Sequence, residues 1–327
     1  MKAFLNLVRW PNLLIVAATM ILMRYAVIGP VISKLTLVLT NNPVEEIPLS
    51  LKSPWYDFLV LLIATLSITA GGYVINDYFD IKADLINRGE VIVGTKIPRR
   101  TAMMWHNILN LVGVAAGFYI SWKAGYFWMG ILFLIVSGLL YFYSASYKRQ
   151  FLVGNIVVAL LTGMVPMLVA IYEWPALYRF CYENAVSPPV LSLVFYWMGG
   201  FGVFAFLTTL AREIIKDIED FEGDLAYGRN TLPVITGTVT ARIISIFLII
   251  LTSGLLYIVW YMLLNDKITL IYISCAIVAP LLYVVYQLII SSGKKQLHSA
   301  SRLMKIIMIS GILYSVVVKI ILDLNLV

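Results

Sequence analysis

The chain has 327 residues, of which 61% are hydrophobic and only 13% are charged. So little polar surface cannot cover a water-soluble core, which excludes an ordinary soluble globular protein. The net charge of +7 needs no nucleic-acid partner to explain it, because a basic inner face is typical of membrane proteins.

Nine segments are long and apolar enough to cross a bilayer, since a helix needs about 20 apolar residues to span the hydrocarbon core. In chain order they are residues 9–29, 56–76, 101–122, 125–143, 152–172, 192–212, 241–263, 267–291 and 303–322. The first is expected to be retained, because no small-residue cleavage site follows it. The sequence therefore predicts an all-α integral membrane protein with nine transmembrane helices, which form one domain over residues 1–327.

Lysine and arginine are distributed unevenly between the two sides of this predicted bundle. Most of the 24 basic residues fall in the segments that lie on the same side as the N-terminus. Cytoplasmic loops carry such an excess of positive charge. The N-terminus and the loops on its side are therefore predicted to be cytoplasmic, in a multi-pass protein of the cell membrane.

The acidic residues are also concentrated on that side. More than half of the 17 acids follow the second or the sixth span: Asp77, Asp80, Asp84 and Glu90, then Glu213, Asp217, Glu219, Asp220, Glu222 and Asp224. The others have no pattern. If the only role of the acids were to keep loops soluble, we would expect them on both sides of the membrane.

Both acidic clusters contain carboxylates at positions i, i+3 and i+7: Asp77, Asp80 and Asp84 in the first, Asp217, Asp220 and Asp224 in the second. On a helix these positions share one face. Like charges at a membrane boundary repel, and a bound cation relieves the repulsion. Magnesium takes oxygen ligands and is commonly held by carboxylates together with substrate phosphates. Two facing clusters are therefore expected to hold a magnesium diphosphate, whereas the simpler alternative is two water-facing helix ends with regularly spaced acids.

These residues resemble the signature motifs of the UbiA superfamily of intramembrane prenyltransferases. Asn76-Asp77-x-x-Asp80-x-x-x-Asp84 is similar to the first motif, and Asp220-x-x-x-Asp224, followed by Gly228 and Thr231, is similar to the second. Tyr143-Ser144-x-x-x-Lys148-Arg149 looks like the basic segment between them. The nine spans match the fold of that family, so the resemblance covers nearly the whole chain.

The resemblance implies transfer of a prenyl group from a prenyl diphosphate to an acceptor, with release of pyrophosphate. It implies two Mg²⁺ ions bound with the diphosphate, and Asp77, Asp80, Asp84, Asp220 and Asp224 as catalytic residues. Asn76 joins the first three aspartates in one metal site. Asp220 and Asp224 form the other, with Asp217 as an additional acid whose role as a ligand is left open.

Basic and polar residues near these motifs are the candidates for substrate binding. Those expected to contact phosphate oxygens are Arg88, Lys148, Arg149, Arg212, Lys216 and Arg229, although each could instead anchor the inner face. Tyr143 is an aromatic candidate to face the allylic cation, with helix packing as the alternative. For the amides Asn12 and Asn155, acceptor binding competes with helix packing.

The acceptor is predicted from a closer resemblance. The segments Arg212–Asp217 and Arg229–Pro233 look most like the digeranylgeranylglyceryl phosphate synthase branch, whose acceptor is geranylgeranylglyceryl phosphate in ether-lipid synthesis. Lys96, with Arg99 and Arg100, would then contact the phosphate of the acceptor. The chain departs from that branch at Asn87-Arg88-Gly89-Glu90, where a proline-rich turn is usual.

Two alternatives are kept open. One is an aromatic prenyltransferase of quinone synthesis, with a hydroxybenzoate or hydroxynaphthoate as the acceptor. The other is a cation-coupled transporter, although transporters usually place their carboxylates near the middle of the membrane, and these acids lie at the span ends.

Overall fold

The structure is a computed structural model that describes residues 2–34, 36–38, 46–88, 91–184, 192–290 and 293–324. Within these residues it contains nine helical spans that are long and apolar enough to cross a membrane. Each predicted segment coincides with one of these spans, although several helices continue beyond the predicted limits. The all-α fold with nine membrane helices is therefore confirmed. The side chains of residues 83, 84 and 86–88 are outside the description.

The first half of the chain supplies spans one to four. A short helix α1 precedes a first span made of α2, a π-helical turn η1 and α3, and a small antiparallel hairpin, β1 with β2, follows it. The bounds are α1 Lys2–Leu7, α2 Trp10–Leu22, η1 Met23–Ile28, α3 Gly29–Ser33, β1 Thr36–Val38, β2 Glu46–Pro48, α4 Trp55–Arg88, α5 Arg99–Lys123, η2 Phe127–Gly130, α6 Ile131–Ala145 and η3 Tyr147–Arg149.

The second half supplies spans five to nine and two short helices after the sixth span. The seventh and eighth spans contain the π-helical turns η4 and η5. The bounds are α7 Val153–Glu183, α8 Ser192–Glu219, α9 Phe221–Ala226, α10 Leu232–Thr236, α11 Thr238–Val259, η4 Trp260–Leu264, α12 Lys267–Tyr272, η5 Ile273–Val278, α13 Ala279–Ile290 and α14 Lys294–Asp323.

Two of the π-helical turns lie just before prolines. η1 ends two residues before Pro30, and η5 ends two residues before Pro280. A proline inside a helix lacks an N–H donor, and its ring clashes with the carbonyl one turn earlier. A wider turn before the ring relieves that clash, which allows both spans to continue as one helical rod.

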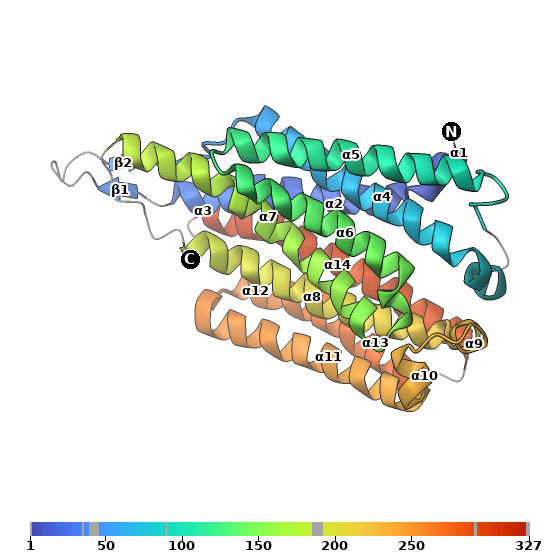
Figure 1. Cartoon of the computed structure of the whole chain (residues 1–327). Helices are drawn as coiled ribbons and strands as arrows, with labels where there is room; N and C mark the ends of the chain where they lie inside the picture. Colours follow the sequence, from blue (N-terminus) through green and yellow to red (C-terminus); the bar gives the residue numbers. More distant parts are fainter. Residues whose placement is uncertain are drawn as a thin grey trace.

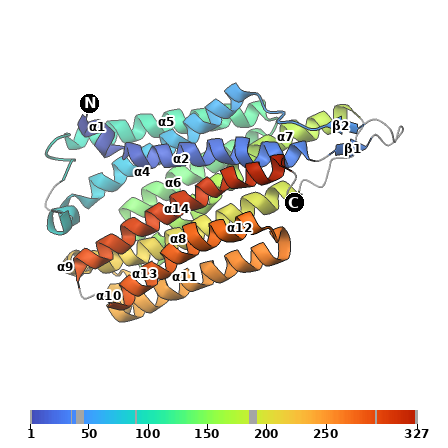
Figure 2. The ribbon, with the colours of Figure 1, turned by 180° about the vertical axis from the view of Figure 1, so that it is seen from behind.

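The spans lie side by side, with the N-terminus, α9 and α10 at one end and the C-terminus, β1 and β2 at the other (Figure 1). We call these the motif end and the hairpin end. Helix α8 packs against α7, α11 and α14, and from behind α14 crosses the bundle between α2 and α8 (Figure 2). These contacts bring the first, sixth and ninth spans together around one interior.

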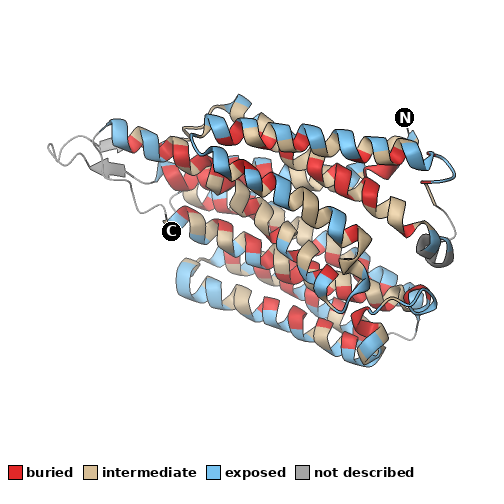
Figure 3. Ribbon diagram, viewed as in Figure 1, coloured by how far each residue is buried: buried red, intermediate tan, exposed pale blue. Residues whose placement is uncertain are grey.

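Buried residues face the bundle axis and exposed ones face outward (Figure 3). The outward residues are largely apolar, and Leu111, for example, is 72% exposed. Such a surface fits lipid as its solvent. Inside, Gly163 of α7 and Gly202 of α8 touch so closely that a Cβ on either would lie 2.7 Å from the other's carbonyl oxygen, an approach that small residues permit between membrane helices.

At the hairpin end the fifth span is longer than predicted, and it contains a buried ion pair. The fifth predicted span ends at residue 172, but α7 remains helical to Glu183. Arg24 and Glu173, which showed no pattern in the sequence, form a buried ion pair of 3.3 Å. Glu173 also accepts backbone hydrogen bonds from Lys52 and Ser53, of 2.8 and 2.9 Å. This pair ties spans one and five to the start of span two.

Candidate active site

A cavity of about 400 Å³ opens among α2, α4, α6, α7, α8 and α14. Its polar part is at the motif end and contains residues of both acidic clusters. Its remaining wall is mostly apolar and includes Met23, Phe133, Leu168, Phe201 and Ile312, with a few threonines among them. The cavity therefore joins a charged chamber to an apolar channel, as a ligand with a charged head and a hydrocarbon tail requires.

The first acidic motif lies on the last turns of α4. This helix has 34 residues, so at 1.5 Å per residue it is about 50 Å long and extends beyond a hydrocarbon core of about 30 Å. Asn76 and Asp80 are one turn apart and both line the cavity. Asp77 does not line it, and instead pairs with Arg9 at 2.7 Å. Asp84 falls among the side chains outside the description.

Asp80 is the centre of the polar contacts. It is 8% exposed, and its Oδ1 accepts hydrogen bonds from Lys148 at 2.7 Å and from Arg229 at 2.6 Å. Lys148 also donates to Oδ1 of Asn76 at 3.2 Å. Lys148 comes from η3 at the end of the fourth span, where the basic segment was expected. The segment between the motifs thus reaches the first motif directly.

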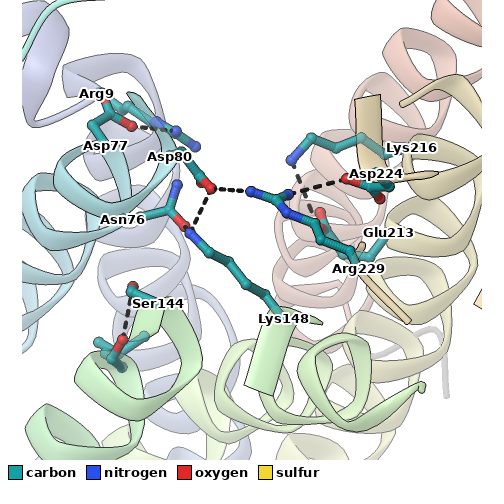
Figure 4. Close-up of polar contacts among 11 residues, drawn as sticks. Arg9, Asn76, Asp77, Asp80, Ser144, Lys148, Glu213, Lys216, Asp224 and Arg229 are labelled. Carbon is teal, nitrogen blue, oxygen red and sulfur yellow. Dashed lines mark hydrogen bonds and ion pairs between the residues drawn. The ribbon is translucent and has the colours of Figure 1, made fainter. Parts of the chain in front are cut away.

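Arg229 links the two motifs (Figure 4). Its Nη2 donates to Asp80 and its Nη1 donates to Oδ1 of Asp224 at 3.1 Å. Burial lowers the pKa of Arg229, but the charges of Asp80 and Asp224 outweigh burial and the pKa is raised. Burial also raises the pKa of Asp224; Arg229 opposes this rise and the neighbouring Asp220 adds to it. Arg229 therefore offsets part of the cost of burying the Asp224 carboxylate.

The second motif is not on one uninterrupted helix, contrary to the expectation from its spacing. Helix α8 ends at Glu219 and α9 starts at Phe221, so a turn at Asp220 separates Asp217 from Asp224. All three aspartates still line the cavity. Asn155, near the start of α7, donates to Asp217 at 2.7 Å and does not itself line the cavity, so its observed role is to hold that carboxylate.

The cavity contains a second group of cations. Arg9, Arg212, Lys216 and Lys305 line it, together with Asn12, Tyr73 and Glu213. Arg212 and Lys216 pair with Glu213 at 2.7 and 3.8 Å, and Lys305 donates to Asn12 at 2.6 Å. Arg9 has a φ of 51°, a left-handed conformation that is costly for a residue with a side chain, and it lies 5.1 Å over the Tyr73 ring.

Most of the predicted site residues meet in this cavity. Those that line it are Asn12, Asn76, Asp80, Tyr143, Lys148, Arg212, Lys216, Asp217, Asp220, Asp224 and Arg229. Lys96 and Arg149 are exposed and do not line it. The side chain of Arg88 is outside the description.

Arg9, Glu213 and Lys305 were missed as site residues. Glu213 had a signal in the sequence, because it precedes Asp217 by one helical turn. Arg9 and Lys305 had none beyond their charge, since only the packing of distant spans brings them to the site.

The donor set of the acidic clusters fits a hard divalent cation. Its atoms are carboxylate and amide oxygens, which Mg²⁺ prefers. Among the described residues, no three acidic, histidine or cysteine side chains converge as a preformed metal cluster. Asp80 instead carries Lys148 and Arg229, so cationic side chains balance its charge in this arrangement.

Comparison with known proteins gives the same assignment. The sequence pattern of the UbiA prenyltransferase family matches residues 49–309. The digeranylgeranylglyceryl phosphate synthase of Methanosphaera stadtmanae is 32% identical over 255 residues, which cover 77% of this chain and 84% of the relative.

Solved structures share the fold. One, from a study of digeranylgeranylglyceryl phosphate synthase in membranes, has a TM-score of 0.62 at 23% identity and covers 96% of this chain and 98% of its own. A UbiA homologue from Archaeoglobus fulgidus bound to DMAPP and Mg²⁺ has a TM-score of 0.52 at 18% identity and covers 96% and 99%. The chain belongs to the UbiA prenyltransferase family and is an integral membrane prenyltransferase.

Proposed function

We propose that the protein transfers a geranylgeranyl group from geranylgeranyl diphosphate to the free glycerol hydroxyl of geranylgeranylglyceryl phosphate, with Mg²⁺ as the cofactor. The observation that carries this proposal is one cavity that brings together Asp80 of α4, Asp220 of the α8–α9 turn and Asp224 of α9, next to an apolar channel. A magnesium diphosphate fits the acidic chamber, and a prenyl chain fits the channel.

Two Mg²⁺ ions are proposed, one for each motif. Asn76 and Asp80 would hold the first, with Asp84 as a further ligand from the same helix. Asp220 and Asp224 would hold the second, with Asp217 beside them. Asp77 pairs with Arg9, and its proposed role is at the edge of the first site. Bound Mg²⁺ supplies positive charge that stabilises the departing pyrophosphate.

Lys148 and Arg229 are the proposed diphosphate ligands from the protein. Both reach between the acidic motifs, where the diphosphate would lie. Arginine can contact two phosphate oxygens at once, whereas lysine acts as a point charge. In the resting arrangement these cations pair with carboxylates, and substrate phosphate would take over their hydrogen bonds when the carboxylates bind metal.

The proposed reaction breaks the allylic C–O bond of the donor and forms a C–O bond to the acceptor hydroxyl. Pyrophosphate leaves with the bonding electrons, and the hydroxyl proton passes to pyrophosphate or to a carboxylate of the cavity. Tyr143 lines the chamber, where its ring face can stabilise an allylic cation, whereas the Tyr73 ring already packs against Arg9. The apolar wall excludes water, which would otherwise capture that cation.

The acceptor proposal is supported by the named relatives, of which several at 31–38% identity are digeranylgeranylglyceryl phosphate synthases. One domain over the whole chain is proposed, because both motifs and the ninth span line the same cavity. A cytoplasmic motif end is also proposed, since most of the 24 basic residues are on that side and positive loops stay inside.

The test is a transfer assay with purified protein in detergent, labelled geranylgeranyl diphosphate, Mg²⁺, and one of two acceptors, geranylgeranylglyceryl phosphate or hydroxybenzoate. The expected result is labelled diether phosphate and pyrophosphate with the glycerol acceptor. Product formed only with hydroxybenzoate would overturn the acceptor proposal and leave prenyl transfer in place. Turnover of the glycerol acceptor without any divalent cation would overturn the metal proposal.

A further inference from the structure

The cavity contains two oppositely charged regions. In the first, Asp80, Asp217, Asp220 and Asp224 outnumber the cations Lys148 and Arg229. In the second, Arg9, Arg212, Lys216 and Lys305 outnumber the carboxylates Asp77 and Glu213 that pair with them. The first region therefore carries an excess of negative charge, and the second an excess of positive charge.

We propose that Arg9, Arg212 and Lys305 form a separate subsite that binds the phosphate of the acceptor. The inference rests on the proposed function, because it assumes an acceptor with a phosphate monoester. It changes the sequence-based interpretation, in which Lys96, Arg99 and Arg100 were to contact that phosphate. Lys96 is exposed, and none of the three lines the cavity.

Lys305 is the most informative member of this subsite. It lies on α14, and its ammonium group donates to Asn12 of α2 at 2.6 Å. Its electrostatic neighbours are Arg212 and Arg9, which both repel it. A lysine that faces a cavity beside two arginines destabilises the empty site. An anion between the three charges would turn that repulsion into attraction.

Arg212 has a free hydrogen-bond donor for such an anion. Its Nη1 contacts Glu213 at 2.7 Å, but its Nε is buried and has no hydrogen-bond partner. A buried donor without an acceptor destabilises the empty site. A phosphate oxygen is the acceptor that an arginine fork prefers, so a bound phosphate would satisfy this atom.

The amount of charge also suits a phosphate monoester. The second region has four cations against two carboxylates, whereas a phosphate monoester carries about −1.5 to −2 at pH 7. The donor diphosphate does not need these cations, since Mg²⁺, Lys148 and Arg229 would neutralise it in the first region. The two substrates would therefore be sorted by charge within one cavity, each with its prenyl chain in the apolar part.

The test compares acceptors with and without the phosphate in three variants of the full chain. Lys305→Met removes the charge and keeps a similar shape, Lys305→Arg restores the charge, and Lys295→Met is the matched control from an exposed position of α14. The measured quantity is the ratio of kcat/KM for geranylgeranylglyceryl phosphate to kcat/KM for geranylgeranylglycerol. The KM of the donor is measured alongside.

Lys305→Met is expected to lower this ratio by about 10- to 100-fold, the range for loss of one charged hydrogen bond. Lys305→Arg is expected to recover most of the ratio, and Lys295→Met to match the wild type. An unchanged ratio in Lys305→Met would overturn the subsite. A rise in the KM of the donor with no change in the ratio would assign Lys305 to the diphosphate and overturn it as well.

A binding measurement separates this inference from the proposed function. Thermal unfolding of the detergent-solubilised protein is followed with and without geranylgeranylglyceryl phosphate, and the prenyl donor is absent throughout. The ligand is expected to raise the unfolding temperature of the wild type and to leave that of Lys305→Met unchanged. If the wild type is stabilised but no acceptor is prenylated, the function fails and the subsite stands. If the ligand stabilises both proteins equally, the subsite is wrong, whatever the activity.

Discussion

Asp80→Asn tests the centre of the site, because this substitution removes a charge that two buried cations share. Lys148 and Arg229 lie 2.7 and 2.6 Å from the same oxygen, and their side chains are only 7% and 14% exposed. Removing one partner of a buried ion pair typically costs about 3–5 kcal/mol, since the remaining charge stays desolvated. We therefore expect Asp80→Asn to lower the free energy of unfolding by about 3 kcal/mol and to abolish turnover.

The assay is SDS-induced unfolding in mixed micelles of four proteins: wild type, Asp80→Asn, Arg229→Gln and the double variant. Groups in direct contact have coupling energies of about 0.5–3 kcal/mol, and independent sites are additive within about 0.5 kcal/mol. We expect a coupling above about 1 kcal/mol between Asp80 and Arg229. Asp323→Asn, at an exposed position, is the control. Additive effects of the two substitutions would refute the bridge between the motifs.

Three further outcomes are expected. EDTA should abolish transfer and excess Mg²⁺ should restore it, measured as labelled product; activity in EDTA would contradict a metal requirement. Arg24→Met should lower the free energy of unfolding by about 3 kcal/mol, because it leaves the Glu173 carboxylate buried without its ion-pair partner. Adding Glu173→Gln to this variant should recover part of the loss. An unchanged free energy of unfolding in Arg24→Met would refute the role of this pair. Gly202→Leu should destabilise the protein by about 1–3 kcal/mol, because its Cβ would lie 2.7 Å from the Gly163 oxygen. The control is Gly254→Leu, whose Cβ would meet no atom within 4 Å and which should have little effect.

The membrane spans could be predicted from the sequence because hydropathy over about 20 residues is a local property. The predicted segment 56–76 lies within the observed span Trp55–Lys82, for example. What hydropathy could not give is how far helices continue beyond the lipid. Helix α4 extends to Arg88 and α7 to Glu183, so residues that were assigned to loops are helical.

The acidic half of the site was also within reach of the sequence. Asp80 and Asp224 belong to motifs with a regular spacing, and that spacing marks both as candidate metal ligands. The basic half was not within reach, because its members are brought together only by tertiary packing. Lys305 and Asn12 are 293 positions apart, and no local pattern links them. Lys305 lines the cavity, whereas Lys295 on the same helix is exposed, and the sequence gives no means of telling them apart.

The central claim is that the acidic chamber binds a prenyl diphosphate only together with Mg²⁺. Equilibrium binding of an unreactive thiodiphosphate analogue of geranylgeranyl diphosphate to the purified protein, with Mg²⁺ or with EDTA, tests it most directly. We predict tight binding with Mg²⁺, and a loss of at least about 100-fold in EDTA and in Asp220→Asn, because the carboxylates of the chamber would then repel the diphosphate. Equal affinity with and without the metal would contradict the proposed site.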